Sequence, residues 1–413
     1  MRFFRLALSS YVLLAAFAVA GAQENDSRSQ DHWVGTWAAA PFATVNDGTV
    51  LAQDTTFRQT VHVSLGGSTA RVVFSNEFSA RHEALTISGA NIAPTSGDGT
   101  INPALARAIT FDGRPETTIP AGTLVISDPI AIKVSALSDL VITMFVPKQP
   151  ITSLTMHHTS VQTNYDATGN QLNAKTLSGA RTSKHWYFLK GIDVLAGPDA
   201  SSVVTLGDSI TDGAGSTVDA NNRWPDFLAR RLQSDKKTAD IGVLNEGIGG
   251  NRLLHEGTGP SALARFDRDV LSQTGVRYLI VYESINDVGG LANQKEPDNQ
   301  ITSAQLISAL NQIIVRAHTH GIKVFGGTVT PFQGANYYTE EGEKVRQATN
   351  HFIRNSGKFD GVIDFDKMLR EPDNPGHIVD AYSGNDAHRD HQHPNDTGYK
   401  VMGQGIDLKL FEK

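Results

Sequence analysis

The fold is decided by residues 203–213, which read VVTLGDSITDG. Residues 203–206 are apolar apart from one threonine and predict a short buried strand. A polar, glycine-bearing loop follows, and residues 224–234 predict a helix. Ser209 therefore stands at the carboxyl end of a strand and before a helix, which is where an open α/β sheet presents its reactive groups.

The second half of the chain repeats this alternation of strands and helices. Strands are expected at residues 203–206, 242–245, 278–282, 324–329 and 361–365. Helices are expected at residues 224–234, 262–273, 303–320, 340–355 and 397–411. Such alternation predicts a parallel sheet with helices on both faces.

The first half of the chain has a different texture, with many short strands and turn signals between them. Strands are expected at residues 56–64, 70–75, 84–88, 107–111, 123–127, 131–134, 140–146 and 157–165. The pair Gly66-Gly67 predicts a hairpin between the first two of these strands. Closely spaced short strands of this kind predict an antiparallel β-sandwich.

The chain begins with the pattern of a secretory signal. Arg2 and Arg5 precede an apolar run over residues 6–20, and the small residues Ala20-Gly21-Ala22 follow. We expect cleavage after Ala22, with the site after Ala20 as the alternative. The run is shorter than the roughly 20 residues of a membrane span, so we expect a secreted or periplasmic protein without stable membrane insertion.

These observations predict four regions along the chain. They are a signal peptide at 1–22, a flexible segment at 23–32, the β-sandwich at 33–195 and the α/β domain at 201–413.

Composition excludes several classes of site. The chain has no cysteine, so it forms no disulfide, thiolate metal site or cysteine nucleophile. Its formal net charge is −7, and no run of five or more basic residues occurs, which argues against nucleic-acid binding. Oligomeric state leaves no signal in the sequence.

Four blocks of the α/β domain together supply the groups that acyl transfer requires, namely a nucleophile, a base, a group that orients the base, and donors for an oxyanion. Ser209 suits the nucleophile, His393 the base, and Asp390, three residues before His393, the orienting carboxylate. The backbone N–H groups of Ser209 and Gly250, with the side-chain amide of Asn286, suit the oxyanion donors.

Each block has a simpler alternative when taken alone. Residues 245–251 also read as an ordinary glycine turn, and Asn286 as a turn or helix-cap residue. The last block is dense enough in His388, Asp390, His391 and His393 to suggest a zinc-like metal site. A serine nucleophile with its base needs no metal, so we expect neither a metal nor an organic cofactor.

The four blocks resemble those of the GDSL-type, or SGNH, serine hydrolases. That family takes its name from Ser, Gly, Asn and His, which here match Ser209, Gly250, Asn286 and His393. The chain is further similar to a secreted two-domain branch related to xylan esterases. The marks of that branch are residues 33–39, 75–78, 251–254, 265–267 and 327–332.

The resemblance implies a flavodoxin-like three-layer α/β/α hydrolase domain preceded by the β-sandwich. It implies a secreted serine esterase that cleaves carboxylic esters through an acyl-enzyme and removes acetyl groups from plant polysaccharides or oligosaccharides. A lipase or short-chain lipid esterase of the same fold is one alternative. A carbohydrate-binding surface protein that retains the fold without catalysis is another.

Two departures from the family pattern stand near the predicted site. Ser284 occupies a position where the family usually has glycine, which predicts a change in how the loop presents Asn286. The segment before Asp390, residues 385–389, is longer than usual, and its Asp386 competes as the orienting carboxylate. Only Asp390 has the Asp-x-x-His spacing to His393.

Other polar residues near the blocks are interpreted as structural. Asp208 and Asp212, on either side of the serine, are expected to bind loop N–H groups. Asp287 is expected to brace its own loop, and Arg265 to form an ion pair within the domain. His157, in the β-rich half, is expected to be an ordinary histidine with satisfied hydrogen bonds.

Overall fold

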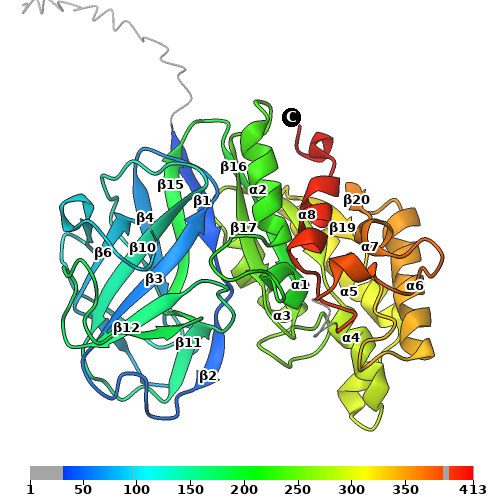
Figure 1. The fold of residues 1–413 in the computed structure, drawn as a ribbon, viewed down its shortest axis with the longest axis horizontal. Helices are drawn as coiled ribbons and strands as arrows, with labels where there is room; N and C mark the ends of the chain where they lie inside the picture. The colour runs from blue at the N-terminus through cyan, green and yellow to red at the C-terminus, as the bar shows by residue number, and fades with distance from the viewer. Residues whose placement is uncertain (1–30, 96, 385–389, 413) are drawn as a thin grey trace, which may run out of the picture.

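The computed structural model describes residues 31–95, 97–384 and 390–412, which form a strand-rich N-terminal region beside an α/β region (Figure 1). The predicted signal peptide, 1–22, lies outside the described residues, as do 23–30 of the segment that follows it. Within the described ranges, no helix has the length and apolar composition needed to cross a lipid bilayer.

The described part of the N-terminal region is built from fifteen strands and one 3₁₀ turn, Pro103–Leu105. The strands are β1 His32–Ala38, β2 Phe42–Val45, β3 Thr55–Val63, β4 Ala70–Ser75, β5 Leu85–Ile87, β6 Gly89–Pro94, β7 Arg107–Ile109, β8 Thr117–Ile119, β9 Leu124–Ile126, β10 Ser138–Val146, β11 Ser153–His157, β12 Asn164–Thr168, β13 Arg181–Ser183, β14 Trp186–Tyr187 and β15 Leu189–Ala196.

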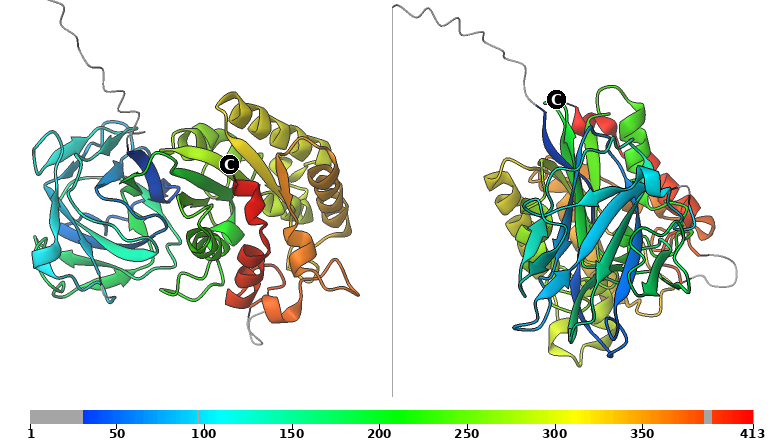
Figure 2. Two further views of the ribbon diagram at one scale, coloured as in Figure 1. Left: turned by 90° about the horizontal axis from the view of Figure 1, so that it is seen from above. Right: turned by 90° about the vertical axis from the view of Figure 1, so that its left-hand side faces the viewer.

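Two antiparallel sheets of this region enclose one apolar core, as the sandwich prediction requires (Figure 2). One sheet has the order β1-β15-β4-β9 and the other β13-β12-β3-β10-β6-β7. Phe74 and Ile192 come to the core from the first sheet, and Val61 and Ile142 from the second. All four side chains are fully buried. The small sheets β14-β11-β2 and β5-β8 complete the region.

The predicted hairpin between residues 56–64 and 70–75 is wrong. Strand β3 pairs with β10 and β12, whereas β4 pairs with β15 and β9, so the connection crosses from one sheet to the other. Gly66 and Gly67 are needed for close packing instead of a tight turn. A Cβ on Gly66 would lie 2.9 Å from the carbonyl oxygen of Val134, and one on Gly67 would lie 2.6 Å from Cβ of Val194.

Two other predicted strands also differ from the structure. Residues 131–134 contribute only an isolated bridge, from Val134 to Gly67. The expected strand 157–165 is interrupted between β11 and β12, because the Ser160 hydroxyl donates to the carbonyl of Gln162 and closes a turn there. An alternating pattern therefore located most strands of the sandwich but neither their partners nor their interruptions.

The α/β region contains a five-stranded parallel sheet of order β17-β16-β18-β19-β20. Its strands are β16 Ser201–Gly207, β17 Ile241–Gly247, β18 Val276–Tyr282, β19 Lys323–Gly327 and β20 Gly361–Ile363. Numbered within the domain, the order is 2-1-3-4-5, which is the flavodoxin-like arrangement. Every residue of β16 is buried, as expected for a central strand covered on both faces. The predicted fold class is confirmed.

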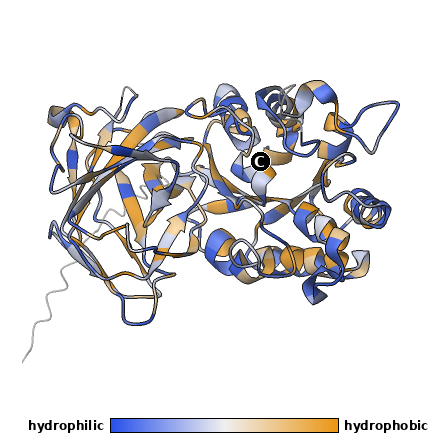
Figure 3. Ribbon diagram, turned by 60° about the horizontal axis from the view of Figure 1, so that its bottom comes forward, coloured by the Kyte–Doolittle hydropathy of each residue, from blue (hydrophilic) through white to orange (hydrophobic). Residues whose placement is uncertain are grey.

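Helices cover both faces of this sheet (Figure 3). Helices α2, α7 and α8 pack together on one face, while α3, α4, α5 and α6 pack on the other. Their bounds are α1 Ser209–Asp212, α2 Trp224–Ser234, α3 Ala262–Phe266, α4 Ile285–Gly290, α5 Ser303–Thr319, α6 Glu340–Asn355, α7 Phe365–Leu369 and α8 Asp396–Gly405. Shorter helical turns lie at Asp267–Leu271, Leu291–Asn293, Pro297–Asn299, Asp380–Tyr382 and Leu408–Phe411.

The sandwich covers the open edge of the parallel sheet. Strand β17 is an edge strand, and strand β1 packs against it. The hydroxyl of Ser64 accepts the N–H of Val243 at 2.8 Å, and its proton lies between the carbonyls of Thr36, at 2.6 Å, and Val243, at 3.2 Å. A Cβ on Gly242 would lie 2.5 Å from the carbonyl oxygen of Gly35, which shows how closely the backbones approach.

Ser284 precedes α4 in a backbone conformation that suits glycine. Its φ is +103°, in the region that residues with a Cβ rarely adopt. Its hydroxyl is buried, and no residue within the described ranges forms a hydrogen bond with it. The departure noted from the sequence therefore has a structural cost at the start of the helix that carries Asn286.

We expect Ser284→Gly to raise the free energy of unfolding by about 1 kcal/mol, because it removes both the strained φ and the orphaned hydroxyl. Urea unfolding at pH 7 measures this change. The control is Ser308→Gly, at an exposed position inside α5, which should lower stability. A Ser284→Gly protein no more stable than the parent would contradict the expectation.

Candidate active site

Ser209 is presented by a sharp turn between β16 and α1. A Cβ on Gly207 would lie 2.2 Å from Oγ1 of Thr211 and 2.4 Å from the carbonyl oxygen of Tyr282, so only glycine fits where the strand ends. Asp208 caps α1 by accepting the N–H of Ile210 at 2.9 Å, as its sequence interpretation expected. Ser209 is the first residue of this short helix.

Ser209, His393 and Asp390 are brought into one hydrogen-bonded line. Oγ of Ser209 lies 2.8 Å from Nε2 of His393, and Nδ1 of His393 lies 2.5 Å from Oδ2 of Asp390. Oδ1 of Asp390 accepts the backbone N–H groups of Gln392 and His393. Partial burial opposes ionisation of Asp390, but the hydrogen bonds and charge of His393 outweigh it and lower the pKa of Asp390 to about 2. The competing Asp386 lies outside the described residues.

The three expected oxyanion donors lie at the ends of three adjacent strands. Gly207 is paired with Gly247 of β17 on one side and with Tyr282 of β18 on the other, so the loops that follow leave the same edge of the sheet. One N–H of the Asn286 amide donates to the carbonyl of Asn251 at 2.8 Å, which fixes this amide beside Gly250.

The donor groups themselves are available for a ligand. Among the described residues, none accepts a hydrogen bond from the backbone N–H of Ser209 or of Gly250. Gly250 has a φ of +78°, and a Cβ there would lie 2.7 Å from Oγ1 of Thr258. Glycine is therefore required for the loop to adopt this shape.

The loop after β17 is held in place by the side chain of Arg265, which is fully buried. Its guanidinium donates to the carbonyls of Gly207 and Glu246 and to Oδ1 of Asn251, and it pairs with Asp269 at 3.2 Å. The expected ion pair within the domain is thus present.

Asp287 braces the loop after β17 through its carboxylate, and not its own loop as the sequence had suggested. It accepts the backbone N–H groups of Leu253 and Leu254 at 2.7 and 3.1 Å.

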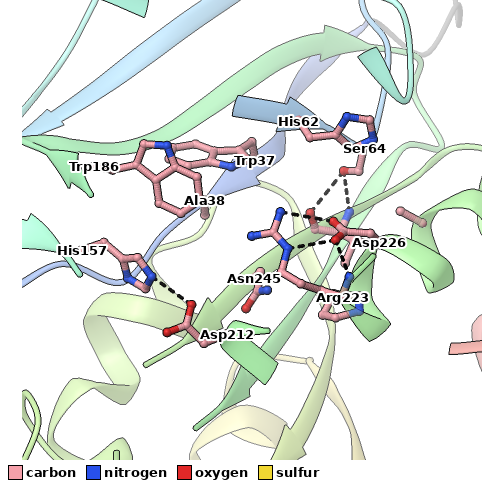
Figure 4. Close-up of a pocket in the computed structure, with 13 residues that line it drawn as sticks. Trp37, Ala38, His62, Ser64, His157, Trp186, Asp212, Arg223, Asp226 and Asn245 are labelled. Carbon is pink, nitrogen blue, oxygen red and sulfur yellow. Dashed lines mark hydrogen bonds and ion pairs between the residues drawn. The ribbon is translucent and has the colours of Figure 1, made fainter. Parts of the chain in front are cut away.

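A histidine of the N-terminal region also reaches this part of the molecule. Nε2 of His157 lies 3.0 Å from Oδ1 of Asp212, the last residue of α1, and the other oxygen of Asp212 accepts the N–H of Gly249 (Figure 4). The sequence interpretation treated both residues as structural, and their hydrogen bonds are indeed satisfied. What it missed is that the pair joins the two regions next to Gly250.

Sequence reasoning also missed a second buried carboxyl group next to the nucleophile. Asp208 and Glu283 are both buried, and their side chains form a hydrogen bond with each other. Burial raises the pKa of Asp208 to about 6 and that of Glu283 well above its usual range. Two buried carboxyl groups in contact disfavour double ionisation, so the pair favours holding one proton.

The proposed metal ligands are divided between two places. Asp390 and His393 bind each other and Ser209, and His388 lies outside the described residues. His391 lies instead with His377 and Asp380, whose ligand atoms are all within 4.8 Å of one another. These three residues are the described set that could hold a cation, and none of them belongs to the Ser209 line.

We expect Glu283→Gln to remove a pH-dependent loss of stability. Above the ordinary Glu pKa of 4.5, unfolding releases a proton from Glu283, because its pKa in the folded protein is much higher; the native protein therefore loses stability as the pH rises. The free energy of unfolding of Glu283→Gln, relative to the parent, should grow between pH 4 and pH 7. Urea unfolding at each pH measures it.

Glu341→Gln is the matched control, because Glu341 is exposed on α6. Its difference from the parent should stay near zero at every pH. If the difference for Glu283→Gln is equally flat, Glu283 titrates normally in the folded protein and the expectation is wrong.

A family model for the GDSL-like lipase/acylhydrolase family matches residues 205–401. No curated protein matches the chain.

Several solved structures are similar to about half of this chain. A GDSL-like lipase from Bacteroides thetaiotaomicron is 18% identical, with 51% of this chain and 88% of that chain covered and a TM-score of 0.37. A variant of an acetyl xylan esterase from Geobacillus stearothermophilus is 16% identical, with 51% and 95% covered and a TM-score of 0.37.

The match of the family model covers all four blocks, from the strand before Ser209 to the helix after His393. Residues 205–401 of this chain therefore belong to the GDSL-like lipase/acylhydrolase family, and the protein is a carboxylic ester hydrolase.

Proposed function

We propose that this protein is a secreted serine esterase that works through an acyl-enzyme on Ser209. The observation that carries the proposal is the line from Ser209 Oγ to His393 Nε2 and from His393 Nδ1 to Asp390. In this arrangement the carboxylate fixes the imidazole, and the imidazole faces the hydroxyl. A serine hydroxyl is a weak nucleophile alone and needs such a base.

The first step forms the acyl-enzyme. Nε2 of His393 takes the proton of the Ser209 hydroxyl as Oγ bonds to the ester carbonyl carbon. The carbonyl oxygen becomes an oxyanion, which accepts from the N–H groups of Ser209 and Gly250 and from the free N–H of the Asn286 amide. The C–O bond to the alcohol then breaks, and the alcohol leaves with the proton that His393 carried.

The second step returns the enzyme to its starting state. Water gives a proton to Nε2 of His393 and adds to the acyl carbon, and the same donors bind the second oxyanion. The bond from the acyl carbon to Oγ of Ser209 breaks, and His393 returns the proton to Oγ. Asp390 stays ionised in both steps, as its lowered pKa favours.

For the substrate, we propose acetyl esters of plant polysaccharides or oligosaccharides. The support is the resemblance of residues 33–39, 75–78 and 251–254 to the two-domain branch related to xylan esterases. We also propose export, with removal of residues 1–22, because these residues carry the charge and apolar pattern of a signal peptide. Esters of short lipid acids are the alternative substrates for the same chemistry.

We expect Ser209→Ala to lower kcat on an aryl acetate at least about 1,000-fold, because no other group can form the acyl bond. Ser234→Ala is the control, since Ser234 lies at the exposed end of α2. Spectrophotometric release of the phenol measures both. A Ser209→Ala protein with more than a tenth of the parental rate would exclude this nucleophile.

We expect the native protein to release acetate from acetylated xylo-oligosaccharides faster than it releases fatty acid from short-chain triacylglycerols at equal ester concentration. Acetate and fatty acid are quantified by chromatography, with Ser209→Ala as the blank. Preference for the lipid esters would overturn the carbohydrate proposal and leave the serine mechanism in place. Inactivity on every ester tested would overturn the mechanism as well.

A further inference from the structure

His157 is a buried residue of the N-terminal region with acceptors on both ring nitrogens. Nδ1 lies 2.9 Å from the carbonyl oxygen of Ala40, and Nε2 lies 3.0 Å from Oδ1 of Asp212. A carbonyl and a carboxylate can only accept, so both nitrogens must carry a proton. Burial disfavours the charged ring, but the carboxylate of Asp212 outweighs this effect and raises the pKa of His157.

Asp212 also forms a hydrogen bond to the loop that contains Gly250. It ends the helix that Ser209 begins, and its Oδ2 accepts the N–H of Gly249 at 2.9 Å. Gly249 directly precedes Gly250, whose N–H is a proposed oxyanion donor. A single carboxylate thus joins His157, the helix of the nucleophile and the loop of the oxyanion donor.

Apolar contacts cover the same loop from the N-terminal side. Ala40, between β1 and β2, and Phe42, the first residue of β2, form a small buried cluster with Ile248, which lies in the loop itself. Phe42 also packs against the backbone of Gly259, because a Cβ there would lie 3.2 Å from Cβ of Phe42. The loop is therefore held by both a charge pair and packing from the N-terminal region.

The surroundings of the pair exclude bulk water. A cavity of about 30 Å³ lies between the two regions, with His157 and Asp212 in its wall beside Trp37 and Trp186 (Figure 4). The two indole rings meet edge to face at 4.9 Å, and Trp186 is 5.4 Å from the ring of His157. A charge-assisted hydrogen bond in such a setting holds its geometry strongly.

We propose that the N-terminal region is a positioning element for catalysis, in which His157 fixes Asp212 and thereby the Gly249–Gly250 backbone at the oxyanion site. The inference rests on the proposed function, since it concerns the donor that Gly250 supplies. His157 and Asp212 touch no reacting atom and act through the loop. A displacement of about 1 Å in such a donor lowers a rate by about 100-fold.

The chain offers a matched control in His62 and Asp139. These residues form a second His–Asp contact, with Nδ1 of His62 at 2.6 Å from Oδ1 of Asp139, between paired strands β3 and β10. His62 lines the same cavity but has no hydrogen bond to the loop at 247–251. Removing it tests the loss of a His–Asp contact without the loss of the connection to Gly249.

The experiment compares His157→Leu, His157→Gln and His62→Leu with the parent. On an aryl acetate we expect His157→Leu to lower kcat about 10- to 100-fold with KM changed less than about 3-fold. His157→Gln should recover part of this loss, because its amide can donate to Asp212. His62→Leu should keep kcat within about 2-fold. Equal kcat values for His157→Leu and His62→Leu would overturn the proposal.

A second measurement does not need activity. Hydrogen exchange of the amides at residues 248–251 should be faster in His157→Leu than in the parent and unchanged in His62→Leu. Unchanged exchange in His157→Leu would overturn the proposal even if the protein is an active esterase. If the parent cleaves no ester, the catalytic role of Ser209 is refuted. Faster exchange in His157→Leu would still support the structural link between His157 and the loop at 248–251.

If His157→Leu does not fold, Asp212→Asn replaces it at nearly constant volume. It removes the negative charge that holds His157 and weakens the acceptor for Gly249. A fall of at least about 10-fold in kcat, with faster exchange at 248–251, supports the proposal, and parental values for both overturn it.

Discussion

The buried guanidinium of Arg265 is the interaction on which the geometry of the site depends. It donates to the carbonyls where β16 and β17 end and to the side chain of Asn251. A fully buried cation is costly unless its donors are satisfied, and here Asp269 and the two strand ends satisfy it. The ends of the two strands, and so the positions of Ser209 and Gly250, are tied to one rigid planar group.

Around this group the site is assembled from contacts that differ greatly in sequence separation. Asp390 and His393 are three residues apart, so the sequence alone revealed their relation. Ser209 is far from both along the chain, and only the folded sheet brings its hydroxyl to the imidazole. The order of short blocks indicated the reaction because three blocks follow strands of the same parallel sheet and the fourth lies in the loop before α8.

The sequence predicted the α/β region better than the sandwich for a physical reason. In the α/β region each helix has one apolar face and the strands are buried. The periodic pattern of apolar residues therefore predicted both the kind of each element and its position in the chain, as for α2 and α6. In the sandwich the alternation of Thr55–Val63 marks a strand but carries no information on its partner, and the glycines at 66 and 67 suggested the wrong one. The contact of His157 with Asp212 and the role of Glu283 were missed because burial, which gives both residues their chemistry, is a property of the fold.

The close approach of Gly35 and Gly242 has a consequence for the history of this chain. Neither backbone leaves room for a Cβ at the junction, since Leu244 lies 2.8 Å from a Cβ on Gly35. The edge N–H of Val243 in β17 also donates to Ser64 of the other region. Recombination that joined either half to an unrelated partner would leave an unprotected strand edge and a steric conflict. The two halves are thus expected to descend together, as one heritable unit and not as exchangeable modules.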